Sequence, residues 1–160
     1  MIWLFTLISF AFGMAQGGEE PAPFGVLATP ATSQTYVAEP QIPSGKFTTA
    51  AEVKPILTAT KGNWVAVREY EGRDLVYFSH LLAWRCGLVG FRYGLNGGAM
   101  VDYPMPPCLI DTAVPNALTG DHLPFIYQGL KSVETLEVEL IYDDLSRDTA
   151  SFTRNSVLIP

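Results

Sequence analysis

A glycine-containing break between two apolar runs constrains the fold of this chain more than any other feature. Residues 88–95 and 99–105 flank Asn96-Gly97-Gly98, which is the pattern of two strands joined by a tight turn. With the turn centred on Gly97, opposed residues have numbers that sum to 194. Arg92 then lies opposite Asp102 on one face, as a favourable charge pair. The other face is wholly apolar or aromatic and consists of Val89, Phe91, Tyr93, Leu95, Ala99, Val101, Tyr103 and Met105.

The same register predicts a disulfide. It places Cys86 opposite Cys108, the only two cysteines of the chain, and opposed Cα atoms lie about 4.5–5.5 Å apart, within the range that a disulfide accepts. A slip of one residue would misplace the core face, the charge pair and the sulfurs together. Prolines in 104–107 predict that the second strand lies at a sheet edge. The alternative is a nucleophilic cysteine that works with a histidine.

The N-terminus indicates export. Residues 2–15 form one apolar run of about 14 residues, shorter than the roughly 20 that span a bilayer. Small residues three and one before Gln16 predict cleavage of a signal peptide over 1–15, although no Lys or Arg precedes the run. We expect a periplasmic or secreted protein, associated with a membrane only through an uncleaved leader. Export favours the disulfide over free thiols.

Two further regions complete the expected organisation. Residues 16–45, rich in Pro, Gly and Ala, show no periodicity and predict a flexible tether. Residues 46–160 are expected to form one compact domain. The chain has a net charge of −6, and this domain has 13 acids and 10 bases without a basic stripe. Nucleic acid is therefore not an expected partner.

One short helix is expected at the start of the domain. Thr49 and Glu52 have the spacing of a capping box, and Gly62 is a natural stop. Pro55 predicts a kink or a late start, because proline removes one helical hydrogen bond. An apolar face at helical spacing is formed by Val53, Ile56, Leu57 and Thr60.

The remaining pattern predicts strands. Residues 64–70 and 75–84 are expected to form a hairpin, with the second run as a central strand that is buried on both faces. Residues 106–131 are expected to be a long loop with a short strand at 124–128. Two final strands are expected at 133–142 and 150–159. The predicted fold class is therefore α+β: one short N-terminal helix packed on an antiparallel sheet of five or six strands, with one disulfide.

No catalytic or metal-binding motif appears, so we expect neither a catalytic site nor a metal or other cofactor. A metal site would need His80, His122 and acids such as Asp111 or Asp121 to converge, and their spacing does not favour one. Ser79 and His80 are not expected to form a dyad, since neighbouring strand residues point to opposite faces. Acids between Glu134 and Asp148 lack the spacing of a calcium loop.

A binding surface is the remaining candidate. Aromatic residues beside arginines suit glycans, peptides or anionic small molecules. The ligand-binding residues we expect are Trp84, Arg85, Arg92 and Asp102, and the broader aromatic and arginine set comprises Trp64, Arg68, Tyr77, Phe91, Tyr93 and Tyr103.

These features favour an exported, non-catalytic module that binds a protein or cell-envelope ligand through the face carrying Arg92 and Asp102 or through loop 106–131. One alternative is a small secreted hydrolase that uses His80 or His122 with Asp111 or Asp121. Another is a structural subunit of an envelope assembly.

Overall fold

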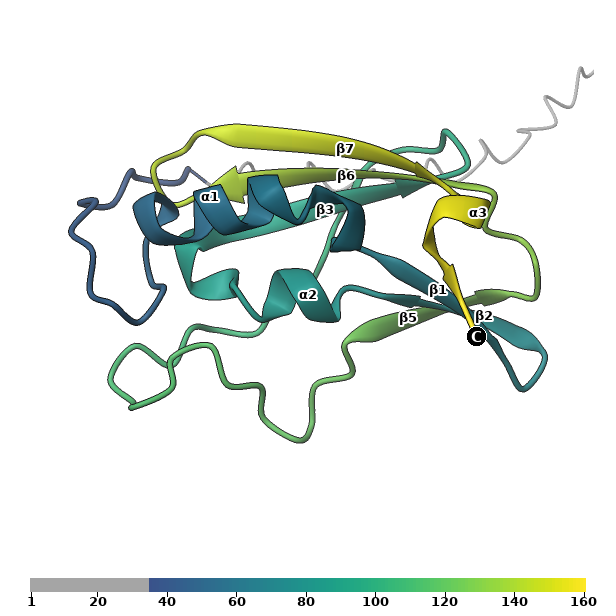
Figure 1. Cartoon of the computed structure of the whole chain (residues 1–160), viewed down its shortest axis with the longest axis horizontal. Helices are drawn as coiled ribbons and strands as arrows, with labels where there is room; N and C mark the ends of the chain where they lie inside the picture. The colour runs from purple at the N-terminus through teal and green to yellow at the C-terminus, as the bar shows by residue number, and fades with distance from the viewer. Residues whose placement is uncertain (1–34) are drawn as a thin grey trace, which may run out of the picture. The chain divides into compact units, whose positions relative to one another are not determined.

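A computed structural model of the chain describes residues 35–160 and confirms the α+β class (Figure 1). The predicted leader at 1–15 and residues 16–34 of the predicted tether lie outside the described residues. Among residues 35–160, no helix has both the length and the apolar character needed to cross a membrane. The helical segments are α1 (Ala50–Ala59), η1 (Lys61–Asn63), α2 (Ser79–Leu82), η2 (Arg85–Gly87) and α3 (Arg154–Val157).

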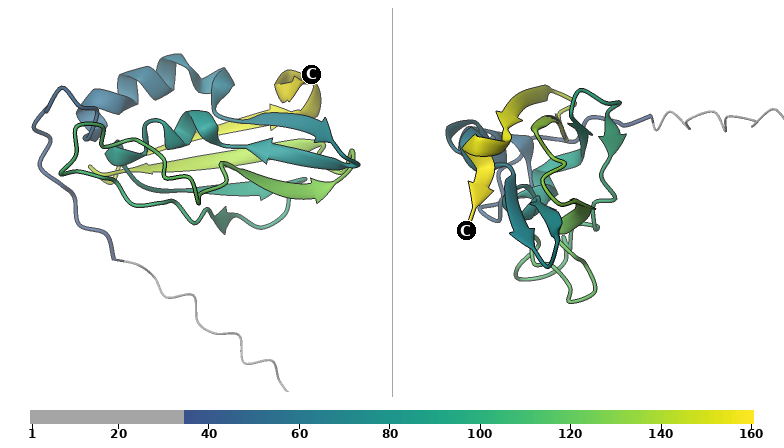
Figure 2. Two further views of the ribbon diagram at one scale, coloured as in Figure 1. Left: turned by 90° about the horizontal axis from the view of Figure 1, so that it is seen from below. Right: turned by 90° about the vertical axis from the view of Figure 1, so that its right-hand side faces the viewer.

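The strands form two sheets rather than the single sheet expected from the sequence. The first sheet has the order β5-β2-β1-β8 and the second has the order β4-β3-β6-β7. Figure 2 shows β1, β2 and β5 side by side. The strands are β1 (Ala66–Tyr70), β2 (Arg73–Tyr77), β3 (Leu88–Leu95), β4 (Val101–Asp102), β5 (Phe125–Gly129), β6 (Thr135–Tyr142), β7 (Arg147–Thr153) and β8 (Leu158–Ile159).

The predicted helix is present, but its start is stabilised differently from a capping box. The Thr49 hydroxyl makes no capping bond to the helix and instead donates to the Glu52 carboxylate, which also accepts from the amides of Gly45 and Thr48. These hydrogen bonds lower the pKa of Glu52, against the opposing effect of burial. The amide of Ala50 donates to the Asp143 carboxylate, so the cap comes from a residue distant in sequence. The helix continues through Pro55.

Residues 39–45, which the sequence places in the tether, contact the domain. The Glu39 amide donates to the Asp143 carbonyl at 2.9 Å. The Gln41 side chain donates to the Asp143 carboxylate at 2.8 Å and accepts from the Ala51 amide at 2.8 Å. These bonds join the segment to the start of α1 and to the turn after β6.

The first predicted hairpin forms with a shorter second strand. β1 and β2 are joined by Glu71 and Gly72, both at positive φ, which suits the right-handed twist of the strands. β2 is central, as expected, but it ends at Tyr77. The prediction of a strand over 78–84 is wrong, because residues 79–82 form α2. An apolar run without alternation does not distinguish a strand from a buried helical turn.

The second hairpin confirms the predicted register. Arg92 pairs with Asp102 and Tyr93 pairs with Val101. The turn contains two residues at positive φ, Asn96 and Gly97, and the return strand regains the register only after residue 100. β4 lies at a sheet edge, as predicted. The expected apolar face is incomplete, since Val101 is 51 % exposed.

The strand expected at 150–159 is interrupted. β7 ends at Thr153, α3 follows, and β8 then pairs in parallel with β1 in the other sheet. Arg154 begins this crossing and forms ion pairs with Asp74 and Glu69. The prediction failed because the polar contacts that end β7 come from β1 and β2, which the local pattern does not reveal.

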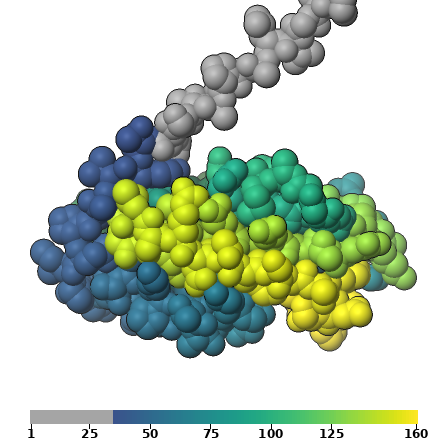
Figure 3. Space-filling view, turned by 90° about the horizontal axis from the view of Figure 1, so that it is seen from above, coloured from purple at the N-terminus to yellow at the C-terminus, as the bar shows by residue number. Residues whose placement is uncertain are grey.

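One hydrophobic core connects the helices and both sheets. The buried face of α1 supplies Val53 and Leu57, and the sheets supply Val67, Val76 and Leu140. In Figure 3, the surfaces of α1 (blue) and β7 (yellow-green) adjoin. Lys54 and Lys61 of this helical region bond to Ser146 and Asp148 beside β7. The two sheets therefore turn one face each toward a shared interior and leave one face each outside.

Candidate functional site

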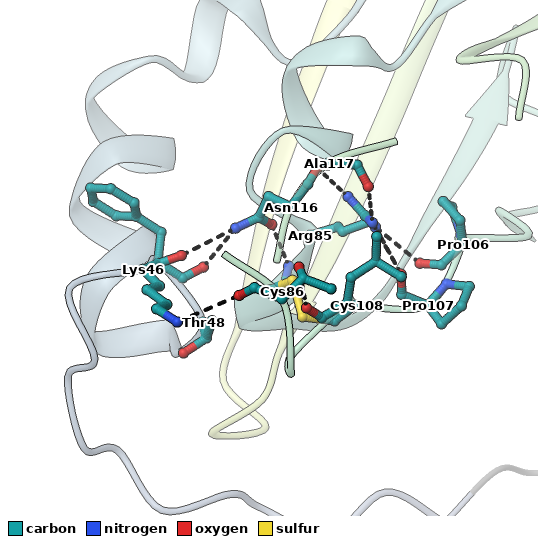
Figure 4. The surroundings of a disulfide bond; sticks show 12 residues. Lys46, Thr48, Arg85, Cys86, Pro106, Pro107, Cys108, Asn116 and Ala117 are labelled. Carbon is teal, nitrogen blue, oxygen red and sulfur yellow. Dashed lines mark hydrogen bonds between the residues drawn. A yellow bond between two sulfur atoms is a disulfide. The ribbon is translucent and has the colours of Figure 1, made fainter. Parts of the chain in front are cut away.

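The predicted disulfide is present. Cys86 and Cys108 are bonded, with their Cα atoms 5.0 Å apart. Neither cysteine lies in a strand ladder, since Cys86 is in η2 and Cys108 is in the loop between β4 and β5. The expectation of a cross-strand pair is therefore wrong in detail. The Cys86 amide also donates to the Asn116 side chain of the same loop (Figure 4).

Arg85 points into this loop rather than toward solvent. Its side chain is buried, and each of its three nitrogens donates to two backbone carbonyl oxygens (Figure 4). Burial lowers the pKa of this guanidinium. The five carbonyl groups belong to Leu82, Pro106, Pro107, Asn116 and Ala117. All the donors of Arg85 are thus used within the chain, and the residue holds the loop in place.

The other predicted ligand-binding residues are separated. Trp84 is half-buried against Phe47, with ring centroids 5.1 Å apart. The Trp84 indole N–H is buried and has no hydrogen-bond partner among the described residues. Arg92 and Asp102 lie in the other sheet and pair with each other at 3.3 Å. Arg92 also contacts Glu139, so its charge is balanced from both neighbouring strands.

The two histidines occupy separate hydrogen-bonded sites. The Thr60 hydroxyl donates to the Ile56 carbonyl at 2.7 Å, so it accepts from the Nε2–H of His80 at 2.8 Å. Burial lowers the pKa of His80. The Tyr103 hydroxyl donates to the Leu123 carbonyl and by the same reasoning accepts from His122.

The hydrolytic and metal-binding alternatives depend on which acidic groups approach the two histidines. Within residues 35–160, neither histidine forms an ion pair with a carboxylate, including those of Asp111 and Asp121. In the same part of the chain, no three His, Cys, Asp or Glu side chains are placed to hold a metal ion. Ser79 and His80 lie in a helical turn rather than a strand, which corrects the geometry assumed for them from the sequence.

Most of the predicted aromatic surface forms the core. Phe91 and Tyr103 stack at 4.6 Å between centroids, and Phe78 contacts both rings. Burial raises the pKa of Tyr103 to about 12, with a smaller contribution from Tyr93. Trp64 is fully buried and donates its indole N–H to a carbonyl of α1. Of the aromatic residues expected at a binding surface, Tyr77 is the one on the outer side of the first sheet.

The outer side of the first sheet carries a different cluster. β1 and β2 pair Arg68 with Leu75 and Tyr70 with Arg73, and β2 and β5 pair Tyr77 with Phe125. Because side chains alternate along a strand, these residues share one face. The opposite face carries Val67 and Val76, which are buried in the core. We define the arginine–tyrosine face as Arg68, Tyr70, Arg73, Tyr77, Phe125 and Tyr127.

The rings of this face form a continuous surface. The centroids of Tyr77 and Phe125 are 5.1 Å apart, and those of Phe125 and Tyr127 are 5.3 Å apart. Tyr70 is 48 % exposed and Tyr127 is 53 % exposed. The Arg68 guanidinium lies 5.5 Å from the Tyr70 ring centroid, and that of Arg73 lies 5.2 Å from the Tyr127 centroid. Each arginine is thus held against an aromatic ring.

Two adjoining hollows open on this face. One has a volume of about 410 Å³ and the other about 510 Å³, both in the range of ligand pockets. They share Arg68 and Tyr77. The first is also lined by Asn63, Ala66, Ser79, His80, Ile159 and Pro160, and the second by Tyr70, Glu71, Arg73, Leu75, Phe125 and Tyr127.

Arg68 and Arg73 differ from the other arginines of the chain. Among the described residues, neither forms an ion pair, and neither guanidinium donates a hydrogen bond. Arg92, Arg147 and Arg154 are paired with carboxylates, whereas Arg85 is bound to carbonyls. The two arginines with unused donors therefore occur together, on the same face.

The aromatic and arginine set predicted from the sequence includes Arg68 and Tyr77, but the sequence did not identify the arginine–tyrosine face as a unit. The signal was present in 66–70 and 73–77, where Arg68 and Tyr70 lie two positions apart and Arg73 and Tyr77 lie four positions apart, so that each pair shares a strand face. Phe125 and Tyr127 could not be joined to it, because the pairing of β5 with β2 spans a long loop.

Comparisons with protein-family models, with curated proteins and with solved structures found no match.

Proposed function

We propose that this protein is an exported, non-catalytic binding module whose arginine–tyrosine face contacts a cell-envelope ligand. The observation that carries the proposal is that Arg68 and Arg73, which have no ionic partner among residues 35–160, lie beside a continuous aromatic surface. Guanidinium groups with free donors bind anionic or polar groups, and exposed tyrosine rings contribute apolar contact together with a hydroxyl.

The charge of the chain strengthens this choice of surface. The net charge is −6, with 16 acidic and 10 basic residues, so the chain as a whole is acidic. Among the described residues, Glu71 is the one acidic side chain that lines the two hollows, beside Arg68 and Arg73. The face is thus a local basic site on an acidic protein, and such a site attracts an anionic ligand.

Export supports the location of the ligand. The disulfide is the kind of bond that persists in an oxidising compartment, and the predicted leader would direct the chain there. Arg85 and the disulfide together hold loop 103–124. This arrangement supports a rigid module that lasts outside the cytosol, where its ligand would be a component of the envelope.

Arginine footprinting tests the proposed face. The full chain would be treated with phenylglyoxal, which modifies accessible arginines, in the presence and absence of an isolated cell-envelope fraction. Mass spectrometry would measure the modification of each arginine. We expect the fraction to protect Arg68 and Arg73.

The chain offers two internal controls. Arg147 has a side chain that is 55 % exposed but lies on the second sheet, so its modification should not change. Arg85 is buried and should stay unmodified while the fold is intact. Unchanged modification of Arg68 and Arg73, or equal protection of Arg147, would contradict a ligand at this face.

A further inference from the structure

We infer that the ligand is an acidic polysaccharide, a chain of sugar rings that carries carboxylate groups. This inference rests on the proposed function. The structure offers three features that such a ligand would use together. These are two guanidiniums with unused donors among the described residues, a separation between the two cations, and an exposed aromatic surface beside them.

The first feature is the unused donors of the two arginines. The guanidiniums of Arg68 and Arg73 lie 5.5 and 5.2 Å from the ring centroids of Tyr70 and Tyr127. Among the described residues neither guanidinium donates a hydrogen bond or forms an ion pair. A carboxylate suits such a group, because its two oxygens accept two parallel N–H bonds.

The second feature is the spacing of the charges. Arg68 is opposite Leu75 and Arg73 is opposite Tyr70, which makes the two arginines diagonal neighbours on adjacent strands. Such positions are about 7–8 Å apart at their Cα atoms. Two separate guanidiniums suit an extended ligand that repeats its carboxylate, since each arginine can bind a different unit.

The third feature is the aromatic surface. Tyr77, Phe125 and Tyr127 present rings at centroid spacings of 5.1 and 5.3 Å. A sugar ring has an apolar C–H face that packs on an aromatic ring, and its hydroxyls can bond to a tyrosine hydroxyl. The two hollows share Arg68 and Tyr77, so one chain could occupy both.

The position of the hollows favours a polysaccharide over a peptide. Extended peptides bind sheets by adding a strand at an open edge, where main-chain groups are unpaired. Arg68 and Arg73 instead project from β1 and β2, the two inner strands of the sheet, whereas β5 forms its open edge. A ligand on this face is therefore recognised by side chains, through their aromatic rings and charges, rather than by main-chain hydrogen bonds.

The test measures binding of the full chain to defined polymers by isothermal titration calorimetry. The acidic probes are polygalacturonate, alginate and hyaluronate, and the neutral probes are methyl-esterified polygalacturonate and dextran. We expect at least one acidic polymer to bind, with affinity about tenfold lower for Arg68→Ala or Arg73→Ala. Esterification should produce a similar loss, because it removes the charge but keeps the sugar chain.

Matched variants separate recognition from folding. Arg147→Ala removes an exposed arginine on the other sheet and should bind as the original chain does. Tyr127→Phe keeps the ring and should weaken binding less than Tyr127→Ser. Circular dichroism spectra of all variants should be unchanged, since these side chains are exposed.

Several results would overturn the inference. Equal binding of esterified and free polygalacturonate would show recognition without charge, and tighter binding of poly-glutamate than of every polysaccharide would indicate an acidic peptide. Failure of all three acidic polymers to bind would also reject it. The arginine footprint distinguishes these outcomes from failure of the proposed function, because Arg68 and Arg73 would still be protected by the envelope fraction.

Discussion

Replacing Asp74 with asparagine should remove the buried ion pair that joins β2 to Arg154 at the end of β7. The Asp74 side chain is fully buried and accepts two hydrogen bonds from Arg154, at 2.7 and 3.0 Å. It also accepts from the amides of Lys131 and Val133. The contact therefore connects β2, the β5–β6 connection and the start of α3.

The structure gives the magnitude of the effect. The Arg154 hydrogen bond, followed by the two amide bonds, lowers the pKa of Asp74 from 3.8 to about 2 despite its burial. A pKa unit corresponds to about 1.4 kcal/mol, so the ionised form contributes about 2 kcal/mol to the free energy of unfolding. The same contact raises the pKa of Arg154, and this is one interaction rather than a second contribution.

The sign of the pH dependence follows from the lowered pKa. The unfolded carboxyl takes up its proton at higher pH than the folded one, so the stabilisation is complete well above pH 3.8 and is lost as the pH falls toward 2. Asp74→Asn should therefore lower the free energy of unfolding by at least about 2 kcal/mol at pH 7. The difference from the original chain should shrink between pH 5 and pH 2.

Urea unfolding, followed by tryptophan fluorescence at several pH values, measures both quantities. Glu69→Gln is the matched control, because Glu69 also pairs with Arg154 but its side chain is 36 % exposed. Its cost should be below about 1 kcal/mol. A loss of less than 1 kcal/mol for Asp74→Asn at pH 7, or a difference that stays constant down to pH 2, would refute this reasoning.

Three further variants test the loop and its supports. Replacing Cys86 and Cys108 with serine opens a loop with a sequence separation of 22 residues and should lower the free energy of unfolding by about 3 kcal/mol in urea; a titration of the original chain under denaturing conditions should find no free thiol. Arg85→Met leaves loop carbonyls without their donor and should cost about 3 kcal/mol or more, measured as a lower Tm and as faster proteolysis within 103–124. Gly87→Ala should cost about 1–3 kcal/mol, because the added methyl would collide with Val53 and lie 2.8 Å from the Thr49 carbonyl oxygen; unchanged stability would contradict that close approach.

The candidate face shows which part of a binding site can be predicted from one sequence. Arg68 and Tyr70 share one face of β1, and Arg73 and Tyr77 share the same face of β2, so a single hairpin already indicates a basic aromatic surface. That Arg68 and Arg73 lack ionic partners within the described part of the chain is not visible in the sequence. It depends on which of the 16 acids approach each arginine after folding.

Arg85 illustrates the opposite case. Its place beside Trp84 and Cys86 predicts a ligand-binding residue, yet the fold surrounds it with carbonyl groups from loop 103–124. Proline-rich segments leave many carbonyls without a backbone donor, because proline has no N–H. A buried guanidinium supplies those donors, and only the path of the loop brings it there.

The sequence by itself determined the local structure: the disulfide, the pairing of Arg92 with Asp102, the α1 helix and the mixed α+β class. Turn residues, alternation and helical spacing act over a few positions, so they are readable without a structure. Tertiary structure decided that the strands form two sheets, that β7 gives way to α3 at Arg154, and that β5 joins Phe125 and Tyr127 to Arg68 and Arg73. These outcomes depend on burial and ion pairing between segments distant in the chain, and no local pattern contains that information.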